Sequence, residues 1–250
     1  MRKLKCRHVD QSRARKGKEM ERICNFKVKD PISALTHAIG FATAIFLMPI
    51  ILTHASYDGA DFIAMVSIGI FMISMVLLYG ASTSYHTFAL SDAGIKRLKK
   101  LDHAMIFVLI AGTYTPICTI ALPMETGNWM LILIWSIAFA GIVFKFCWVT
   151  CPKWVSSVIY IVMGWVCIFA FPQLWGSLTT ANFFWLLGGG IAYTVGGVIY
   201  GMQKVLSKKK TPNVNGMVKK TRFYFGPHEV FHVFVMVGTA CHFIVVYNLV

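Results

Sequence analysis

An all-α bundle of seven membrane-spanning helices is the fold class that the sequence predicts, and three observations lead to it. The 250 residues are 57% hydrophobic and only 14% charged, which is more apolar surface than a soluble domain of this length could bury. Seven separate apolar stretches are each long enough to cross a hydrocarbon core about 30 Å thick. The Lys and Arg residues lie only in the N-terminal tail and in alternate connections between those stretches.

We expect two parts in the chain, a basic N-terminal tail over residues 1–30 and a transmembrane domain over residues 31–250. Turn-forming residues separate the apolar stretches, for example at Tyr57–Gly59, at Pro123–Asn128 and over the longer segment Gln203–Pro227. The seven predicted spans are Ile32–Leu52, Phe62–Phe88, Asp102–Leu122, Trp129–Val149, Val155–Trp175, Phe183–Met202 and His228–Val250.

The positions of the basic residues predict how the bundle is oriented. Of the 24 Lys and Arg residues, 11 lie in the tail, and the others lie in the second-to-third, fourth-to-fifth and sixth-to-seventh connections. Because cytoplasmic loops carry the excess of positive charge, we expect a multi-pass protein of the cell membrane with its N-terminus in the cytoplasm and its C-terminus outside. The tail is too long and too charged for a signal peptide, so we expect no cleaved signal.

The net charge of +14 raises the question of whether the protein binds nucleic acid. The predicted bundle fills the rest of the chain and leaves no module that could read a groove, so we expect no nucleic-acid partner. The basic tail is typical of a solvated segment that fixes topology, and its charge also favours contact with anionic lipid headgroups. The expected partner is therefore the lipid bilayer.

A few polar residues lie inside the predicted spans, where ionisable groups are costly and mark functional sites by default. Ser82 and His86 are four residues apart near the cytoplasmic end of the second span, so they share one helix face. His228 and His232 have the same spacing at the start of the seventh span, and Asp102 opens the third. The topology therefore brings residues from three helices to one depth near the cytoplasmic face.

These residue types indicate a zinc site. Two histidines four residues apart on a helix, here His228 and His232, present their imidazoles side by side to one ion. A third imidazole from His86 leaves the fourth tetrahedral position open, which is typical of a catalytic zinc. Asp102 would then accept or orient a proton, and Ser82 would hydrogen-bond a ligand or the substrate.

Two other interpretations of the same histidines stay open. Buried imidazoles can instead bond to carbonyls or carboxylates without any metal, and the spacing alone would not distinguish this case. The segment His228–His232 also matches the H-E-x-x-H motif, in which Glu229 would be the general base of a metalloprotease. No third ligand follows it, because the chain ends 18 residues after His232 without a further acidic residue.

The remaining histidines of the spans are expected to have lesser roles. His37, near the cytoplasmic end of the first span, is a candidate to contact the metal ligands on the side away from the ion. His103 is expected at an interface beside Asp102. His242 lies ten residues beyond His232, about 15 Å further along the helix, and cannot bind the same ion.

Glycines are concentrated in the sixth predicted span. Because small residues let helix backbones approach closely in lipid, we expect them to serve helix packing, with a lateral opening as the alternative. They are Gly188, Gly189, Gly190, Gly196, Gly197 and Gly201.

The polar residues of spans two, three and seven are together similar to those of a known family. The pattern Ser82-x3-His86, Asp102 and His228-x3-His232 resembles the hemolysin III and progestin/adipoQ receptor family, and the compact size resembles its bacterial hemolysin III branch. The resemblance covers nearly all of the chain, although Glu229 and the long basic tail depart from it. Supporting segments are Thr36–Gly40, Leu101–His103, Gly112–Pro116, Gly226–His228 and Cys241–Phe243.

The resemblance implies a zinc ion held by His86, His228 and His232 near the cytoplasmic side, with Ser82 and Asp102 in the same polar cluster. It implies three kinds of activity: a zinc-dependent hydrolase of lipid amides similar to membrane ceramidases, a pore-forming cytolysin, or a receptor or regulator of membrane state with structural zinc. Seven long spans indicate a resident membrane protein and disfavour a secreted toxin. An open ligand position favours the hydrolase over structural zinc.

Overall fold

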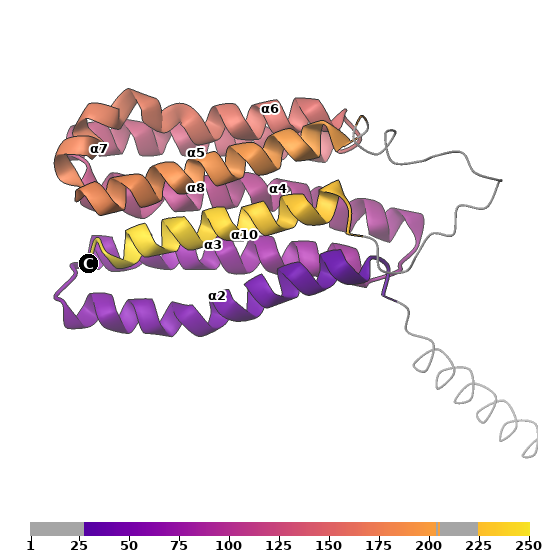
Figure 1. Ribbon diagram of the computed structural model, residues 1–250, viewed down its shortest axis with the longest axis horizontal. Helices are drawn as coiled ribbons and strands as arrows, with labels where there is room; N and C mark the ends of the chain where they lie inside the picture. The colour runs from indigo at the N-terminus through magenta and orange to yellow at the C-terminus, as the bar shows by residue number, and fades with distance from the viewer. Residues whose placement is uncertain (1–27, 204, 206–224) are drawn as a thin grey trace, which may run out of the picture.

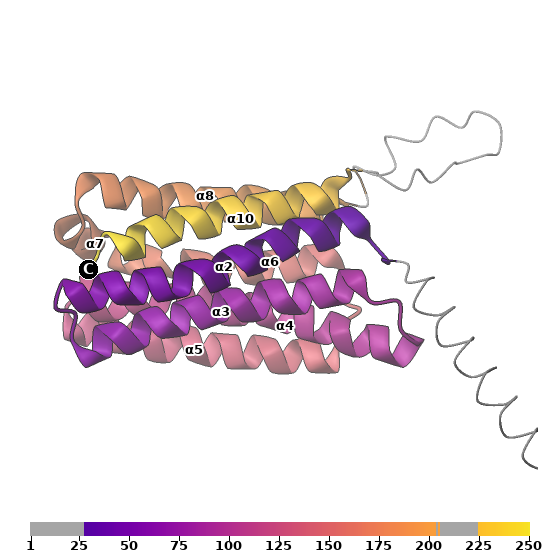
Figure 2. The ribbon, with the colours of Figure 1, turned by 90° about the horizontal axis from the view of Figure 1, so that it is seen from below.

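The computed structural model describes residues 28–203, 205 and 225–250. Within these residues the chain is built from helices and has no strand, and the long helices run side by side in one bundle (Figure 1 and Figure 2). The elements are α2 (Pro31–Tyr57), α3 (Phe62–Thr87), α4 (Asp92–Pro116), η1 (Ile117–Ala121), α5 (Met124–Cys147), α6 (Lys153–Gly164), η2 (Trp165–Ala170), α7 (Phe171–Ser177), α8 (Thr180–Gly201) and α10 (Pro227–Tyr247).

Seven segments of the described chain are long and apolar enough to cross a membrane, which confirms the predicted fold class. The third span joins α4 to η1, and the fifth joins α6, η2 and α7. The start of α2 and the C-terminus lie at opposite ends of the bundle (Figure 1), as an odd number of spans requires. The basic tail lies outside the described residues except for Val28–Asp30, so its contact with lipid headgroups stays a prediction.

The outer surface of the bundle is apolar. Large side chains such as Phe46, Ile132 and Phe139 are 69%, 70% and 70% exposed, respectively. A soluble monomer rarely exposes so much contiguous apolar surface, whereas lipid tails solvate it. The helices keep their backbone hydrogen bonds internal, as the hydrocarbon core demands.

The third span begins ten residues earlier than predicted, and this changes the place of Asp102. The Ser91 side chain accepts a hydrogen bond from the Gly94 amide and so caps the helix, which starts at Asp92. Asp102 therefore lies about 15 Å inside the helix and is buried, whereas the sequence placed it at the helix start. The basic residues before Asp102 are helical rather than part of a loop.

The segment Pro123–Asn128 was predicted as a turn, and this prediction is wrong for most of it. Helix α5 already begins at Met124, with Pro123 as the residue that precedes its first turn. Proline ends the preceding helical segment and fits the start of the next one. The connection between the third and fourth spans is therefore only Leu122 and Pro123.

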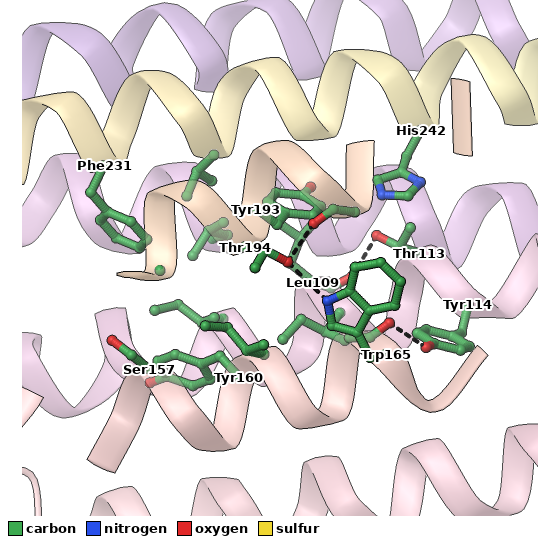
Figure 3. A pocket seen from close by; sticks show the side chains of 18 of the residues that line it. Leu109, Thr113, Tyr114, Ser157, Tyr160, Trp165, Tyr193, Thr194, Phe231 and His242 are labelled. Carbon is green, nitrogen blue, oxygen red and sulfur yellow. Dashed lines mark hydrogen bonds between the residues drawn. The ribbon is translucent and has the colours of Figure 1, made fainter. Parts of the chain in front are cut away.

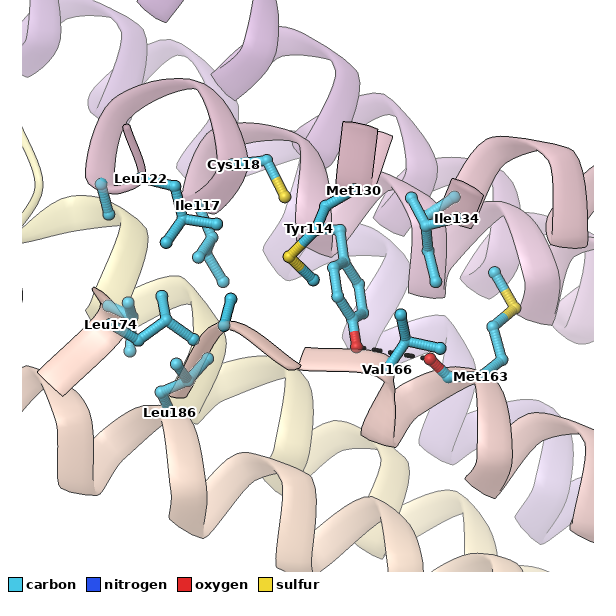
Figure 4. Packing of buried hydrophobic residues seen from close by; sticks show 14 of the residues in the cluster. Tyr114, Ile117, Cys118, Leu122, Met130, Ile134, Met163, Val166, Leu174 and Leu186 are labelled. Carbon is cyan, nitrogen blue, oxygen red and sulfur yellow. Dashed lines mark hydrogen bonds between the residues drawn. The ribbon is translucent and has the colours of Figure 1, made fainter. Parts of the chain in front are cut away.

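The fifth span changes its helical geometry in the middle, and Tyr114 from α4 compensates for the change. The 3₁₀ segment η2 leaves backbone groups without α-helical partners. The Tyr114 hydroxyl donates to the Gly164 carbonyl at 2.7 Å and accepts from the Cys167 amide at 2.9 Å. Around this tyrosine, Met130, Ile134 and other apolar residues of neighbouring helices form a buried cluster (Figure 4).

Lys145 was expected as a charge in the fourth-to-fifth connection, but its side chain is fully buried. It lies in the last turn of α5, and its ammonium donates hydrogen bonds to Cys151 Sγ at 3.2 Å and to Ser156 Oγ at 2.5 Å. A buried ammonium needs such partners because its desolvation is costly. The cluster ties the end of α5 to the start of α6.

The glycines of the sixth span are divided between two kinds of surroundings. A methyl group added at Gly189, Gly196, Gly197 or Gly201 would lie 2.8 to 3.2 Å from side chains of other helices. At Gly188 and Gly190 it would meet nothing within 4 Å. Close packing therefore accounts for four of the six glycines, and no contact explains the other two.

Among the glycines that the structure describes, Gly127 is the one at which a side chain would cost the most. Its added Cβ would lie 2.1 Å from the Cys118 carbonyl oxygen, a backbone atom that cannot rotate away. We expect Gly127→Ala to lower the free energy of unfolding by about 1–3 kcal/mol, the usual cost of overpacking. Thermal unfolding of the purified protein in detergent measures this. Gly188→Ala, which has free space, is the matched control, and equal stability of the two variants would contradict the observed packing.

Candidate metal centre

Three histidines from two helices meet at one end of the bundle. His86 lies in the last turn of α3, and His228 and His232 occupy the first turns of α10. One ring nitrogen from each lies within 4.8 Å of the others, and the Nε2 atoms of His86 and His228 are 3.2 Å apart. His86 and His232 are buried, and His228 is partly buried. The structure thus brings together all three residues that the sequence predicted as metal ligands.

The start of α10 is fixed by local hydrogen bonds that place its histidines. Pro227 occupies the first turn, where its missing N–H costs nothing. Glu229 accepts hydrogen bonds from the Gly226 amide at 2.9 Å and from the Ser33 hydroxyl of α2 at 2.7 Å. The glutamate therefore both caps α10 and holds it against α2.

The other ring nitrogens of two of these histidines are held by residues that the sequence analysis missed. His86 Nδ1 lies 3.1 Å from Asp30 Oδ2, and His232 Nδ1 lies 3.1 Å from Thr36 Oγ1. The hydrogen bond to His86 is the main reason why the pKa of the Asp30 carboxyl lies below its usual value. Carboxylates that bind one imidazole nitrogen in this way orient the other nitrogen toward a metal.

The segment that carries Asp30 is anchored to the end of α3. The amides of Lys29 and Asp30 donate to the carbonyls of Thr87 and His86 at 3.3 and 2.9 Å. The Lys29 ammonium lies 3.4 Å from the centre of the Tyr85 ring. The only sequence signal for Asp30 was an acidic residue directly before the first span, and nothing in that signal pointed to His86.

Asp102 and Ser82 lie beside the histidine cluster but outside the group of possible ligands. Asp102 Oδ2 is 3.2 Å from His103 Nδ1, and His103 Nε2 is 3.2 Å from the Tyr200 hydroxyl. His103 is thus buried among helices, whereas an interface position was expected. Ser82 Oγ is buried close to the Asp102 carboxylate.

His37 packs directly on one of the possible ligands. Its ring stacks on that of His232 with a centroid distance of 3.6 Å and an angle of 9° between planes. Both of its ring nitrogens are buried without a hydrogen-bond partner among the described residues. His37 therefore supports His232 by ring packing and not by a hydrogen bond.

A long cavity begins at the histidine cluster. His228, His232, Ser82 and Asp102 line one end of it. The remainder runs between α4, α6, α8 and α10 toward the other end of the bundle, and its walls are mainly apolar and aromatic (Figure 3). Side chains at its far end include Phe171, Leu174, Phe183 and Leu186.

The same chain matches a known family over most of its length. Residues 26–243 match the protein family described as Haemolysin-III related.

The chain belongs to the hemolysin III family.

Bacterial and fungal proteins are among its relatives. It is 34% identical to Hemolysin-3 of Bacillus cereus over 90% of this chain and 93% of the relative. It is 38% identical to the Hemolysin-3 homolog of Bacillus subtilis over 87% of this chain and 93% of the relative. The ADIPOR-like receptor IZH2 of Saccharomyces cerevisiae is 33% identical over 35% of this chain and 24% of that protein, which fits the wider progestin/adipoQ receptor family. This hemolysin III protein is therefore a multi-pass membrane protein.

The H-E-x-x-H motif of this hemolysin III protein has a structural use. The two histidines of the motif belong to the cluster, but the Glu229 carboxylate is occupied by the Ser33 hydroxyl and the Gly226 amide. A general base must reach the proton that it removes. The positions of these hydrogen bonds favour a capping role for Glu229 over a protease role.

Proposed function

We propose that this protein is a zinc-dependent membrane hydrolase that cleaves the amide bond of a lipid. The observation that carries the proposal is the convergence of three imidazoles, two of which line one end of a long apolar cavity, with the Asp102 carboxylate on the wall at that end. Such a reaction needs a metal ion, a carboxylate for proton transfer and an apolar cavity that binds the lipid chain.

The residues present fit a zinc ion. Ligands of a tetrahedral zinc at about 2.0–2.1 Å lie roughly 3.3 Å from one another. The Nε2 atoms of His86 and His228 are 3.2 Å apart, and the third ligand atom lies within 4.8 Å of them. Asp30 and Thr36 hold the outer nitrogens of His86 and His232, as residues behind metal ligands do. Three protein ligands leave a fourth position for chemistry.

The reaction divides among the residues as follows. Bound zinc supplies Lewis-acid polarisation of the amide carbonyl and makes water a nucleophile near neutral pH. Asp102 lines the cavity beside the cluster and serves as the group that takes a proton from water and returns it to the leaving amine. His103, held by Tyr200, keeps the carboxylate oriented. The Ser82 hydroxyl lines the cavity beside Asp102 and is placed to hydrogen-bond the substrate.

The walls of the cavity favour a lipid substrate over a peptide. A peptide would bring unsatisfied backbone groups into contact with apolar side chains such as Ile110, Leu174 and Leu186. An acyl chain has no polar groups that need hydrogen-bond partners, and it buries apolar surface along the whole cavity. The amide bond would then lie at the histidine end, where the polar groups are.

The histidine end of the bundle faces the cytoplasm of a cell membrane in this proposal. All described Lys and Arg residues lie at that end, which the positive-inside rule assigns to the cytoplasm. Asp58, Asp61 and Glu125 lie in or next to connections at the other end. The basic residues are Lys29, Lys96, Arg97, Lys99, Lys100, Lys145 and Lys153.

We expect Asp102→Asn to lower the turnover of a ceramide by at least about 100-fold, because the amide cannot carry the proton. Zinc content should stay at the wild-type level, since Asp102 is not among the possible ligands. Fatty acid release by purified protein in lipid micelles, together with metal analysis of the same samples, measures both quantities.

Loss of zinc in Asp102→Asn would show that Asp102 supports the metal and not the proton transfer. If zinc-loaded wild-type protein cleaves no lipid amide, the zinc would be structural, as in a receptor or regulator. Dye release from vesicles by the same protein, unchanged in His86→Ala, would replace hydrolysis with cytolysis.

A second prediction concerns Asp30, which touches His86 from outside the cluster. We expect Asp30→Asn to weaken zinc binding by about 10–100-fold, the usual cost of losing a carboxylate behind a histidine ligand. Competition with a chelator of known affinity measures this change. Asp92→Asn, at an exposed position near the same end of the bundle, is the control and should bind zinc like the wild type. Equal affinity in Asp30→Asn and Asp92→Asn would remove Asp30 from the site.

A further inference from the structure

His242 lies deep in the cavity, away from the histidine cluster. It projects from α10 toward the space between α4 and α8, near Tyr193, Thr113 and Trp165 (Figure 3). The residue is 6% exposed, and its Nδ1 atom is buried with no hydrogen-bond partner among the described residues. A buried polar atom without a partner is costly, and more so inside a membrane.

The residues around His242 fix the position of its ring but do not hydrogen-bond to its nitrogens. The Tyr193 ring stacks on the imidazole at a centroid distance of 5.4 Å and an angle of 17°. On another side, a Cβ added at Gly189 would lie 2.8 Å from Nε2, so only glycine leaves room for the ring. The imidazole is therefore held in place by packing, and neither of its nitrogens is hydrogen-bonded to another described residue.

The neighbouring polar groups already have protein partners. The Tyr193 hydroxyl bonds to Thr239 Oγ1 at 2.8 Å. The Trp165 indole donates to Thr194 Oγ1 at 2.9 Å, and the Thr113 hydroxyl donates to a backbone carbonyl at 2.8 Å. Unlike Tyr193, Trp165 and Thr113, the His242 imidazole has no hydrogen-bond partner among the described residues, so a ligand in the cavity could supply one.

We propose that His242 is a polar subsite that binds a hydroxyl or carbonyl oxygen on the chain of a lipid in the cavity. The subsite deepens the proposed function, because it names the substrate class as lipid amides whose acyl chain carries an oxygen part-way along. A free fatty acid with the same oxygen, the product of such a hydrolysis, shares the chemistry and binds in the same way.

The length of α10 sets the position of that oxygen. His232 and His242 are ten residues apart, which corresponds to about 15 Å along the helix. An extended acyl chain whose carbonyl lies at the histidine cluster reaches His242 near its twelfth carbon. An oxygen on the second carbon would stay at the cluster and gain nothing from His242.

Equilibrium binding of fatty acids to the purified full-length protein tests the subsite without any turnover. The probes are stearic acid, stearic acid hydroxylated at the twelfth carbon and stearic acid hydroxylated at the second carbon. We expect the wild type to bind stearic acid hydroxylated at the twelfth carbon about fivefold more tightly than stearic acid. This ratio corresponds to the net free energy of one neutral hydrogen bond. The acid hydroxylated at the second carbon should show no gain that depends on His242.

His242→Phe keeps a flat ring against Tyr193 and removes both nitrogens, so we expect this variant to bind the acid hydroxylated at the twelfth carbon more weakly than stearic acid. His242→Gln restores a hydrogen-bonding group and should recover part of the preference. A wild type that does not prefer that acid, or a preference that survives in His242→Phe, would overturn the subsite.

The same probes separate this inference from the proposed function. In His86→Ala the affinity of every fatty acid is expected to fall, but the preference for hydroxylation at the twelfth carbon should remain, because His242 is unchanged. A zinc-loaded wild type that shows this preference but releases no fatty acid from any lipid amide would support the subsite while removing the hydrolase. Disappearance of the preference in His86→Ala would overturn an independent subsite at His242.

Discussion

The cost of burying polar groups in a membrane is the constraint on which this structure depends. Three imidazoles cannot share a low-dielectric site at such close distances unless something satisfies their nitrogens. Two of the outer nitrogens are satisfied by Asp30 and Thr36, and the converging inner nitrogens are left for a common partner. A single cation, as proposed, would satisfy all of them at once and would account for the gathering of residues from the first, second and seventh spans at one end of the bundle.

The same constraint orders the rest of the interior. Tyr114 supplies hydrogen bonds to the backbone where the fifth span leaves α-helical geometry, and Lys145 finds Cys151 and Ser156. With these demands met by protein groups, the space between the helices can remain apolar and open over most of its length. The protein thus joins a polar end with three converging imidazoles to an apolar interior, and the His242 imidazole stands out because the polar groups around it bond to other protein groups.

Hydropathy and charge predicted the seven spans, because both properties are carried by single residues and need no knowledge of packing. The i, i+4 spacings, together with a topology that brings the ends of two antiparallel spans to one depth, predicted that His86, His228 and His232 meet. Asp30 and Thr36 were missed, because their role depends on how α2 packs against α3 and α10. The third span was misplaced because the basic residues before Asp102 read as a loop, although the Ser91 cap makes them helical. The cavity could not be predicted, since it is the space that packing leaves.

The most direct test of the metal site is elemental analysis of the purified protein, paired with X-ray absorption at the zinc edge. The proposed site predicts one zinc ion per chain with three nitrogen ligands in the wild type, and none in the variant that combines His86→Ala, His228→Ala and His232→Ala. A correctly folded wild type without any transition metal, or a triple variant that keeps its zinc, would contradict the shared role of the three imidazoles.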